Sequence, residues 1–169
     1  AETTLDVEEL LYLTHKIEAQ NLQPLQYGTS GAKKTTLSFW VRSSLTGTYS
    51  VNFYNNNPAT ARSNLQEYTI NTANTWEYKT ITIDGDTTGT YDNDNGQGVL
   101  ISWILAAGSN WHGSPHTGWG DYSGTDDFAS ANNVDFSAQT GDFYLTGVQY
   151  EFGEKATPFE HRSYGDELA

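Results

Sequence analysis

The stretch TTLSFWVRSSLTGTYSVNFYN, residues 35–55, decides the fold class of this chain. Apolar side chains take every second position in each half of the stretch, and they are Leu37, Phe39 and Val41, then Tyr49, Val51 and Phe53. This period of two predicts two β-strands, over residues 35–43 and 48–55, each with one face toward a core. The connection Leu45-Thr-Gly47 is short and contains glycine, so we expect these two strands to pair as a hairpin.

Turn signals divide the rest of the chain into further segments of strand length. Asn55-Asn-Asn-Pro58 is typical of a turn, and long loops are expected over residues 84–98 and 108–139. Residues 99–107, VLISWILAA, are apolar on both faces and predict a central strand that is covered on both sides. Other strands are expected over residues 11–18, 65–71, 76–84 and 142–152.

The N-terminal segment fits two patterns. Asp6 and Glu9 have the spacing of a reciprocal helix cap. From Leu11 onward, a period of two fits as well as a helical period. We expect a brief helix or turn over residues 5–10, followed by a strand over 11–18.

Seven or so short strands separated by turns predict an all-β fold, a two-sheet antiparallel sandwich with long loops. A chain of 169 residues is long enough for one domain with a substantial core. We expect a single sandwich domain over residues 1–157. An extended C-terminal arm over 158–169, fixed at its start by Pro158, should follow.

Composition excludes several classes of function. The formal net charge is −13, with 8 basic against 21 acidic residues, so a nucleic-acid partner is not expected. There is no cysteine and hence no disulfide or thiolate chemistry. Residues 99–107 are the longest apolar run and too short to span a bilayer, and we see no signal-peptide pattern. The many Thr, Ser, Asn, Gly and Tyr residues are typical of an all-β extracellular or virion domain.

The aromatic loop over residues 110–122 is the best candidate site in the sequence. Aromatic rings stack on the CH faces of sugars, and loops on a rigid sandwich often carry binding residues. We expect Trp111, Trp119 and Tyr122 to be the stacking platforms. The polar partners would be Asn110, His112, His116 and Asp121. The alternative is that these aromatic side chains cover a sheet face or a neighbouring subunit.

Three further tryptophans lie within expected strands. Trp103 is expected in the core. Trp40 and Trp76 lie on sheet faces, where packing and binding both remain open and packing is favoured.

Metal and catalytic motifs are weak. A structural calcium ion at the edge of the sandwich is a possible cofactor, with candidate ligands Asp84, Asp86, Asp92 and Asp94. His112 and His116 are four residues apart, but Gly113, Ser114 and Pro115 between them prevent a helical metal pair. Asp126-Asp127 with Asp121 or Asp135 does not establish the carboxyl pair of a glycosidase. We therefore expect no catalytic residues.

Several segments of this sequence resemble motifs of a family of bacteriophage tail-fibre and receptor-binding proteins. They are LSFWVRSSLTGTY at 37–49, NTWEYKTITIDGDTTGTY at 74–91, LAAGS at 105–109, GVQYEFG at 147–153 and ATPFEHRSYGDELA at 156–169. The resemblance extends over roughly residues 11–169. The chain departs from the family in loop 110–122, which is richer in aromatic residues.

The resemblance implies a jelly roll like that of many carbohydrate-binding modules, located in the virion at the surface of a phage tail. It also implies a homotrimer that contacts host-surface glycans without catalysis, joined to neighbouring fibre segments. One alternative is a structural or assembly module of the phage particle without a ligand. Another is a carbohydrate-binding module of a polysaccharide-degrading enzyme. The C-terminal arm would dock on a neighbouring chain or pack on its own sandwich.

Overall fold

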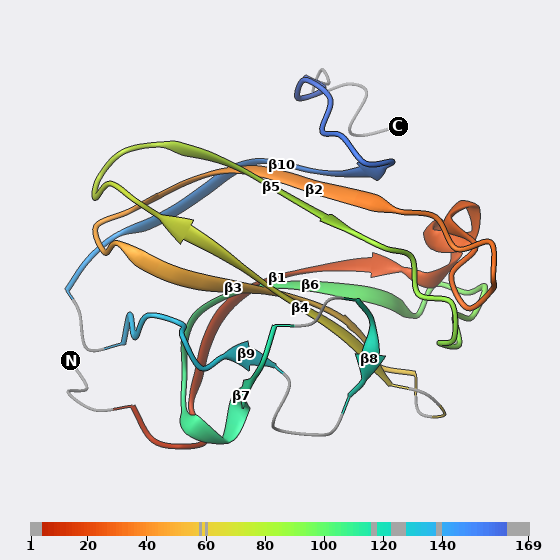
Figure 1. Ribbon diagram of the computed structural model, residues 1–169, viewed down its shortest axis with the longest axis horizontal. Helices are drawn as coiled ribbons and strands as arrows, with labels where there is room; N and C mark the ends of the chain where they lie inside the picture. Colours follow the sequence, from red (N-terminus) through yellow and green to blue (C-terminus); the bar gives the residue numbers. More distant parts are fainter. Residues whose placement is uncertain are drawn as a thin grey trace.

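The computed structural model describes residues 5–57, 59, 61–115, 118–122, 128–137 and 140–161. Two antiparallel sheets pack face to face as a sandwich (Figure 1), which confirms the predicted all-β architecture. Sheet A has the order β1 (Leu10–Glu18), β6 (Gln97–Ala107), β3 (Gly47–Asn55), β4 (Arg62–Ile70) and β8 (Gly120–Asp121). Sheet B has the order β10 (Phe143–Phe152), β2 (Thr35–Ser43) and β5 (Glu77–Ile83).

The core lies between the two sheets. Its central side chains come from alternate positions of β2, β3 and β6, and all are at most 2% exposed: Leu37, Phe39, Val41, Tyr49, Val51, Phe53, Val99, Ile101 and Trp103. Each large apolar side chain buried in this way contributes about 1.5–3 kcal/mol relative to an exposed one. The apolar side chains that alternate in the sequence are therefore those that face the core.

The predicted hairpin between the first two strands is wrong. β2 pairs with β10 and β5 in sheet B, whereas β3 pairs with β4 and β6 in sheet A. The chain crosses from one sheet to the other at residues 44–46. The Tyr49 hydroxyl donates to the Leu45 carbonyl at 2.9 Å and lies 2.9 Å from the Ser43 hydroxyl oxygen. Two strands of one sheet and two strands of facing sheets show the same alternation, because in both arrangements one face of each strand is buried.

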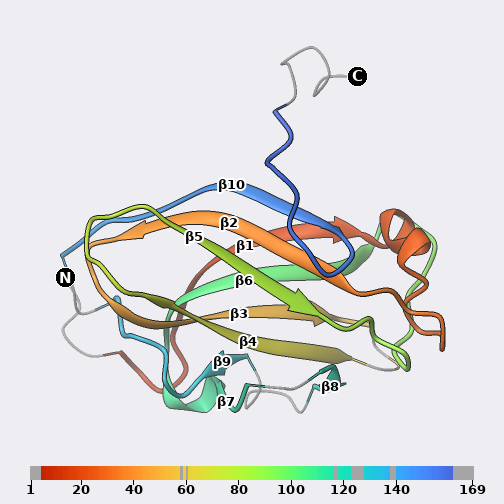
Figure 2. The ribbon, with the colours of Figure 1, turned by 45° about the horizontal axis from the view of Figure 1, so that its top comes forward.

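β6 is the central strand that the sequence predicted, since it lies between β1 and β3. Its inner face belongs to the main core, and on its outer face Ile104 packs against Phe128 and Ala129. The second face is covered by the described residues between 109 and 137, here called the covering segment, which runs below sheet A in Figure 2. That segment contains η2 (Ser109–Trp111), β7 (His112–Gly113), β8 and β9 (Ala129–Ser130), and β7 and β9 form a short parallel pair.

Hydrogen bonds attach this covering segment to sheet A. The Ser130 amide donates to the Ser50 hydroxyl at 3.0 Å, and the Asn52 side-chain amide donates to the Phe128 carbonyl at 3.0 Å. Asn133 Oδ1 accepts from the Ser50 amide at 2.7 Å. The outer face of sheet A is thus closed by the chain itself.

The N-terminal segment forms a turn and not a helix. The Asp6 amide donates to the Glu9 carboxylate at 2.7 Å, as in a capping box, but the chain enters β1 directly afterwards. The sequence did not predict the 3-10 helix η1 (Ala19–Leu25), which buries Leu22 and Leu25 at the three-residue spacing of such a helix. Among the described residues there is no helix of the length and apolarity that crossing a membrane requires.

β10 contains a bulge. Thr146 lies opposite Trp40 and Gln149 lies opposite Ser38, so β10 has one residue more than β2 over this interval. Gly147 in the bulge has φ of 57°, which glycine adopts readily. Before the bulge Leu145 points into the core, and after it Tyr150 does so.

Replacement of Gly47 should destabilise the crossing between the sheets. Gly47 has φ of 134°, and a Cβ atom there would lie 2.5 Å from Val134 Cγ1. We expect Gly47→Ala to lower the free energy of unfolding by about 1–3 kcal/mol, measured by urea denaturation. Gly118→Ala is the matched control, because nothing lies within 4 Å of a Cβ there. Equal stability of the two variants would contradict this account.

Candidate functional site

Trp111 from the predicted loop site covers sheet A. Its indole nitrogen donates to the Glu8 carbonyl at 2.8 Å, and its ring meets the Phe128 ring edge-on at 6.0 Å. The side chain is half-buried and packs against the apolar cluster formed by Ile104, Ala107, Phe128 and Ala129. Its polar atom and much of its ring are therefore already engaged within the domain.

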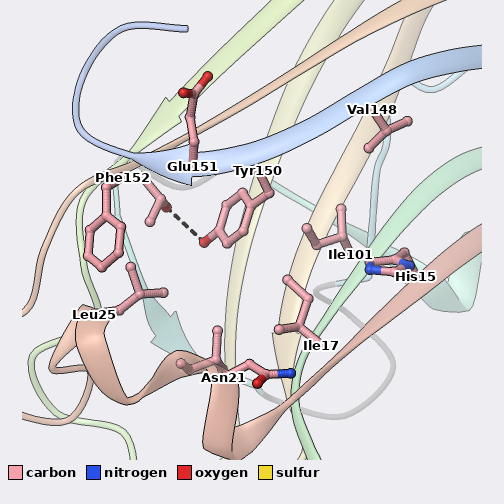
Figure 3. Close-up of a pocket in the computed structure, with 11 residues that line it drawn as sticks. His15, Ile17, Asn21, Leu25, Ile101, Val148, Tyr150, Glu151 and Phe152 are labelled. Carbon is pink, nitrogen blue, oxygen red and sulfur yellow. Dashed lines mark hydrogen bonds between the residues drawn. The ribbon is translucent and has the colours of Figure 1, made fainter. Parts of the chain in front are cut away.

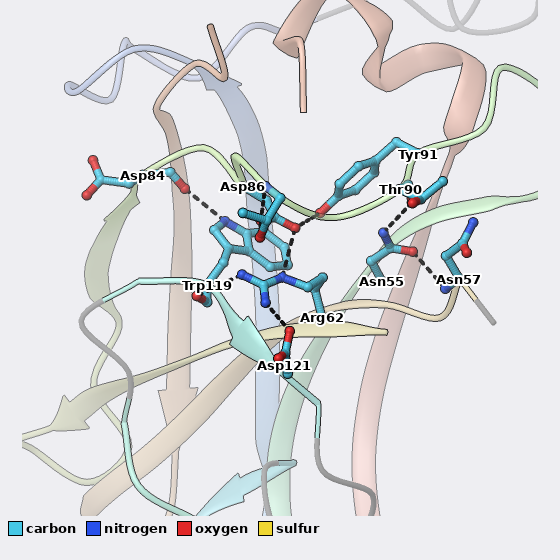
Figure 4. Close-up of polar contacts among 10 residues, drawn as sticks. Asn55, Asn57, Arg62, Asp84, Asp86, Thr90, Tyr91, Trp119 and Asp121 are labelled. Carbon is cyan, nitrogen blue, oxygen red and sulfur yellow. Dashed lines mark hydrogen bonds and ion pairs between the residues drawn. The ribbon is translucent and has the colours of Figure 1, made fainter. Parts of the chain in front are cut away.

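Trp119 is held in a similar way at the other end of the loop. Its indole nitrogen donates to the Asp84 carbonyl at 2.8 Å (Figure 4). Its ring meets the Tyr27 ring edge-on at 5.8 Å. Tyr122, directly after β8, has its ring 4.6 Å from that of Tyr54. Trp119 packs against the main core, so this half of the loop also covers the sandwich.

A buried ion pair fixes Trp119 (Figure 4). Asp86 is fully buried, and its carboxylate accepts from Arg62 Nε at 3.3 Å and from the Tyr91 hydroxyl at 2.9 Å. Burial and the negative charge of Asp86 raise the pKa of Tyr91 well above its usual value. Arg62 also donates to the Trp119 carbonyl at 3.0 Å and pairs with Asp121.

The remaining predicted loop residues do not form one cluster with free polar groups. His112 Nε2 lies 2.9 Å from the Ala107 carbonyl oxygen. The Asn110 side chain is exposed, and its backbone amide donates to the Val7 carbonyl at 3.0 Å. His116 lies outside the described residues. The loop site remains a prediction, and the contacts of Trp111 and Trp119 favour the covering role that the sequence left as the alternative.

The four aspartates proposed as calcium ligands have other partners. Asp84 pairs with Lys34 at 3.3 Å, and Asp86 pairs with Arg62. Asp92 accepts from the Asn57 amide at 3.1 Å, and Asp94 accepts from the Gly96 amide at 2.9 Å. Within the described part of the chain, no three His, Cys, Asp or Glu side chains lie together as a metal would require.

The outer face of sheet B carries four exposed aromatic side chains. Trp40 and Trp76 are each 42% exposed, and Tyr78 and Tyr144 are each 44% exposed. The Trp40 and Tyr78 ring centroids are 5.3 Å apart, and those of Trp76 and Tyr144 are 6.2 Å apart. We call this set the aromatic face. Figures 1 and 2 show that no other strand of the described residues covers this side of sheet B, in contrast to the outer face of sheet A.

The strands position the aromatic face rigidly. Trp40 of β2 lies opposite Tyr78 of β5, and neighbouring residues of β2 point into the core, including Phe39 and Val41. Trp40, Tyr78 and Tyr144 therefore stand on strand backbone whose other face is packed, and Trp76 directly precedes β5. The sequence analysis named Trp40 and Trp76 but not the tyrosines. Tyr144 could have been found from its alternation with Phe143 and Leu145, which face inward.

Glu77 holds the turn that precedes β5 and presents Trp76. Its carboxylate accepts from the Asn71 amide at 2.8 Å, the Thr72 amide at 2.7 Å and Lys79 Nζ at 2.6 Å. Burial opposes ionisation, but these hydrogen bonds outweigh it and lower the pKa of Glu77 to about 2. The negative charge of Glu77 thus stabilises the turn that positions Trp76 in the aromatic face.

Arg42 lies beside the aromatic rings. Its Nε donates to the Asn74 carbonyl at 3.0 Å, and its guanidinium carbon lies 5.3 Å from the centre of the Tyr144 ring. The first contact joins β2 to the turn before Trp76, and the second is a cation–π contact with β10.

The start of the C-terminal arm borders the same face. Thr157 donates through its amide to Glu151 at 2.8 Å, and the Glu160 amide donates to Gln149 at 3.0 Å. These bonds attach the arm to the outer side of β10. The half-exposed Phe159 lies beside Gly147, where an added Cβ atom would be 3.9 Å from Phe159 Cδ2. Hydrogen bonds from Thr157 and Glu160 therefore attach the start of the arm to its own sandwich, and residues 162–169 lie outside the described part.

A separate hollow of about 390 Å³ lies between the edge strands β1 and β10 (Figure 3). Ile17, Ile101 and Tyr150 line its apolar part, and His15 and Asn21 stand at its rim. It lies at the edge of the sandwich, where β1 and β10 are the edge strands of sheets A and B. No residue of the predicted loop site lines this hollow.

Comparisons with known protein families, with curated proteins and with solved structures found no match for the chain.

Low pH should destabilise the turn before β5, because it protonates Glu77. Because its pKa is lower in the folded than in the unfolded chain, its stabilising effect is complete above the unfolded value near 4.5. That effect disappears as the pH falls toward about 2. We expect Glu77→Gln to cost about 1–3 kcal/mol at pH 7 and to flatten this part of the stability profile, measured by denaturation between pH 2 and 7. Glu8→Gln is the control, and an identical profile for both variants would contradict the assignment.

Proposed function

We propose that this chain is a non-catalytic carbohydrate-binding domain that contacts host-surface glycans through the aromatic face. The observation that carries the proposal is the set of four half-exposed aromatic rings on the open side of sheet B. Exposing large rings in this way loses hydrophobic stabilisation, and a contiguous exposed apolar patch commonly marks a binding surface.

The chemistry of the aromatic face suits sugars. The faces of Trp and Tyr rings stack on the CH groups of a pyranose, while the tyrosine hydroxyls and indole nitrogens bond to its hydroxyl groups. The exposed Thr80 and Thr146 lie beside the rings on β5 and β10 and add further polar groups. Since Trp40, Tyr78 and Tyr144 stand on paired strands and Trp76 directly precedes β5, little conformational entropy is lost when a ligand binds.

The setting of this domain in a phage tail fibre is also a proposal, supported by the sequence resemblance. In a homotrimer at the surface of the virion, three aromatic faces would be joined in one rigid particle. Linked sites of this kind bind far more strongly than single ones when the glycans on a cell are dense enough to engage several together.

An assembly role is the second candidate, and β1 is the observation that favours it. Leu11, Tyr12 and Leu13 are each 41–43% exposed on an edge strand of sheet A. Apolar edge strands promote association with another chain. In this alternative the aromatic face would be buried between subunits of the fibre and would take no glycan.

Substitution of the exposed tryptophans tests the binding proposal. We expect Trp40→Ala and Trp76→Ala each to weaken glycan or host-cell binding at least about tenfold, with an unchanged thermal midpoint, because neither side chain is in the core. The measurement is a glycan array followed by titration of the strongest ligand.

Trp111→Ala and Trp119→Ala are the matched controls, since they remove the same side chain from covering positions. They should lower the thermal midpoint and leave the affinity of the folded protein unchanged. The reverse result, with binding lost only in the loop variants, would place the site in residues 110–122. Light scattering completes the test, because loss of oligomers in Trp40→Ala would show the aromatic face to be a subunit contact.

A further inference from the structure

Arg42 is the only lysine or arginine that projects outward from the described residues of β2, β5 and β10. It shares a cross-strand position with Tyr144 of the aromatic face. Lys79 of β5 lies on the inward side, opposite Phe39, and pairs with Glu77. The chain as a whole has a formal net charge of −13. A cation among exposed aromatic rings is therefore a local exception to the charge of the molecule.

Two contacts orient the Arg42 side chain, and neither uses its terminal nitrogens. One contact uses Nε, which donates to the Asn74 carbonyl at 3.0 Å. The other uses the guanidinium plane, whose carbon lies 5.3 Å from the centre of the Tyr144 ring. Neither contact uses the two terminal nitrogens, Nη1 and Nη2, and among the described residues nothing else bonds to them.

Acidic groups are plentiful, but among the residues that the structure describes none forms an ion pair with Arg42. Lys34, Arg62 and Lys79 do each pair with a carboxylate. An arginine that is oriented by two contacts and lacks an acidic partner presents a fixed pair of N–H donors. This fork matches the two oxygens of a carboxylate.

We infer that the aromatic face binds glycans that contain a carboxylate-bearing sugar, and that Arg42 receives the carboxylate. The sugar ring would stack on the tryptophan and tyrosine rings while Nη1 and Nη2 donate to the two carboxylate oxygens. Repulsion by distant acidic residues is screened beyond about 8–10 Å at physiological salt, so it does not prevent this contact. The inference rests on the proposed function, since it names the ligand class of the same site.

The test compares each acidic glycan with its own methyl ester. The ester keeps the sugar ring and removes the charge. An array would carry oligosaccharides with uronic or sialic acids, their methyl esters and neutral glycans, and it would be probed with the full chain. We expect the acids to bind at least about tenfold more tightly than their esters, with a preference that decreases as salt is added.

Variants of Arg42 connect the preference to this side chain. Arg42→Gln should remove the difference between acid and ester and leave the weaker binding of esters, which depends on stacking. Arg42→Lys should keep part of the preference, because it retains the charge without the fork. Lys33→Gln is the control, since it removes one positive charge from an exposed residue just before the other end of β2.

The outcomes separate this inference from the proposed function. If neutral glycans or esters bind as well as acids, and Trp40→Ala abolishes that binding, the function stands and the role of Arg42 is refuted. The role is equally refuted if Arg42→Gln leaves the preference for acids unchanged. If the wild-type chain binds no glycan on the array, the proposed function is refuted and this inference with it.

Discussion

The structure depends on the packing of β2 against the inner faces of β3, β4 and β6. Phe39 of β2 meets the rings of Tyr68 and Trp103 edge-on, at 5.2 Å and 5.9 Å between centroids, which joins the two sheets. Because successive side chains of a strand point to opposite sides, burying Phe39 obliges its neighbour Trp40 to point outward. The aromatic face is thus a direct geometric consequence of the core and inherits its rigidity.

The two sheets differ in how far their outer faces are covered. Sheet A is covered by the described residues between 109 and 137 of the same chain, and the hydrogen bonds of Ser50 and Asn52 attach that cover. Within the described part of the chain, sheet B has no comparable layer, and the start of the C-terminal arm is bonded to β10. The tryptophans of the cover serve packing, while those of sheet B keep much of their surface in solvent. This asymmetry is the reason for assigning binding to sheet B.

Strand existence could be predicted from the sequence, but pairing and exposure could not. The alternation of Leu37, Phe39 and Val41 identifies a strand wherever its partners lie, so the hairpin inferred from Gly47 was wrong while both strands were right. The helix η1 was missed because Leu22 and Leu25 alone give too short a periodic signal. The exposure of a tryptophan depends on which distant segment covers it. A stretch rich in aromatic residues, such as 110–122, therefore looks the same whether it binds or packs.

The bulge at Gly147 has a consequence for how this surface can change during evolution. The extra residue reverses the inward and outward positions along β10, so the first half of the strand presents Tyr144 and the second half presents Gln149 and Glu151 to the arm. If the same residues formed a regular strand without the bulge, neighbouring side chains would exchange roles over half the strand, turning Tyr150 toward solvent and a charged group toward the core. The two halves of β10 are in effect separate modules, in which ring substitutions and arm substitutions can accumulate independently.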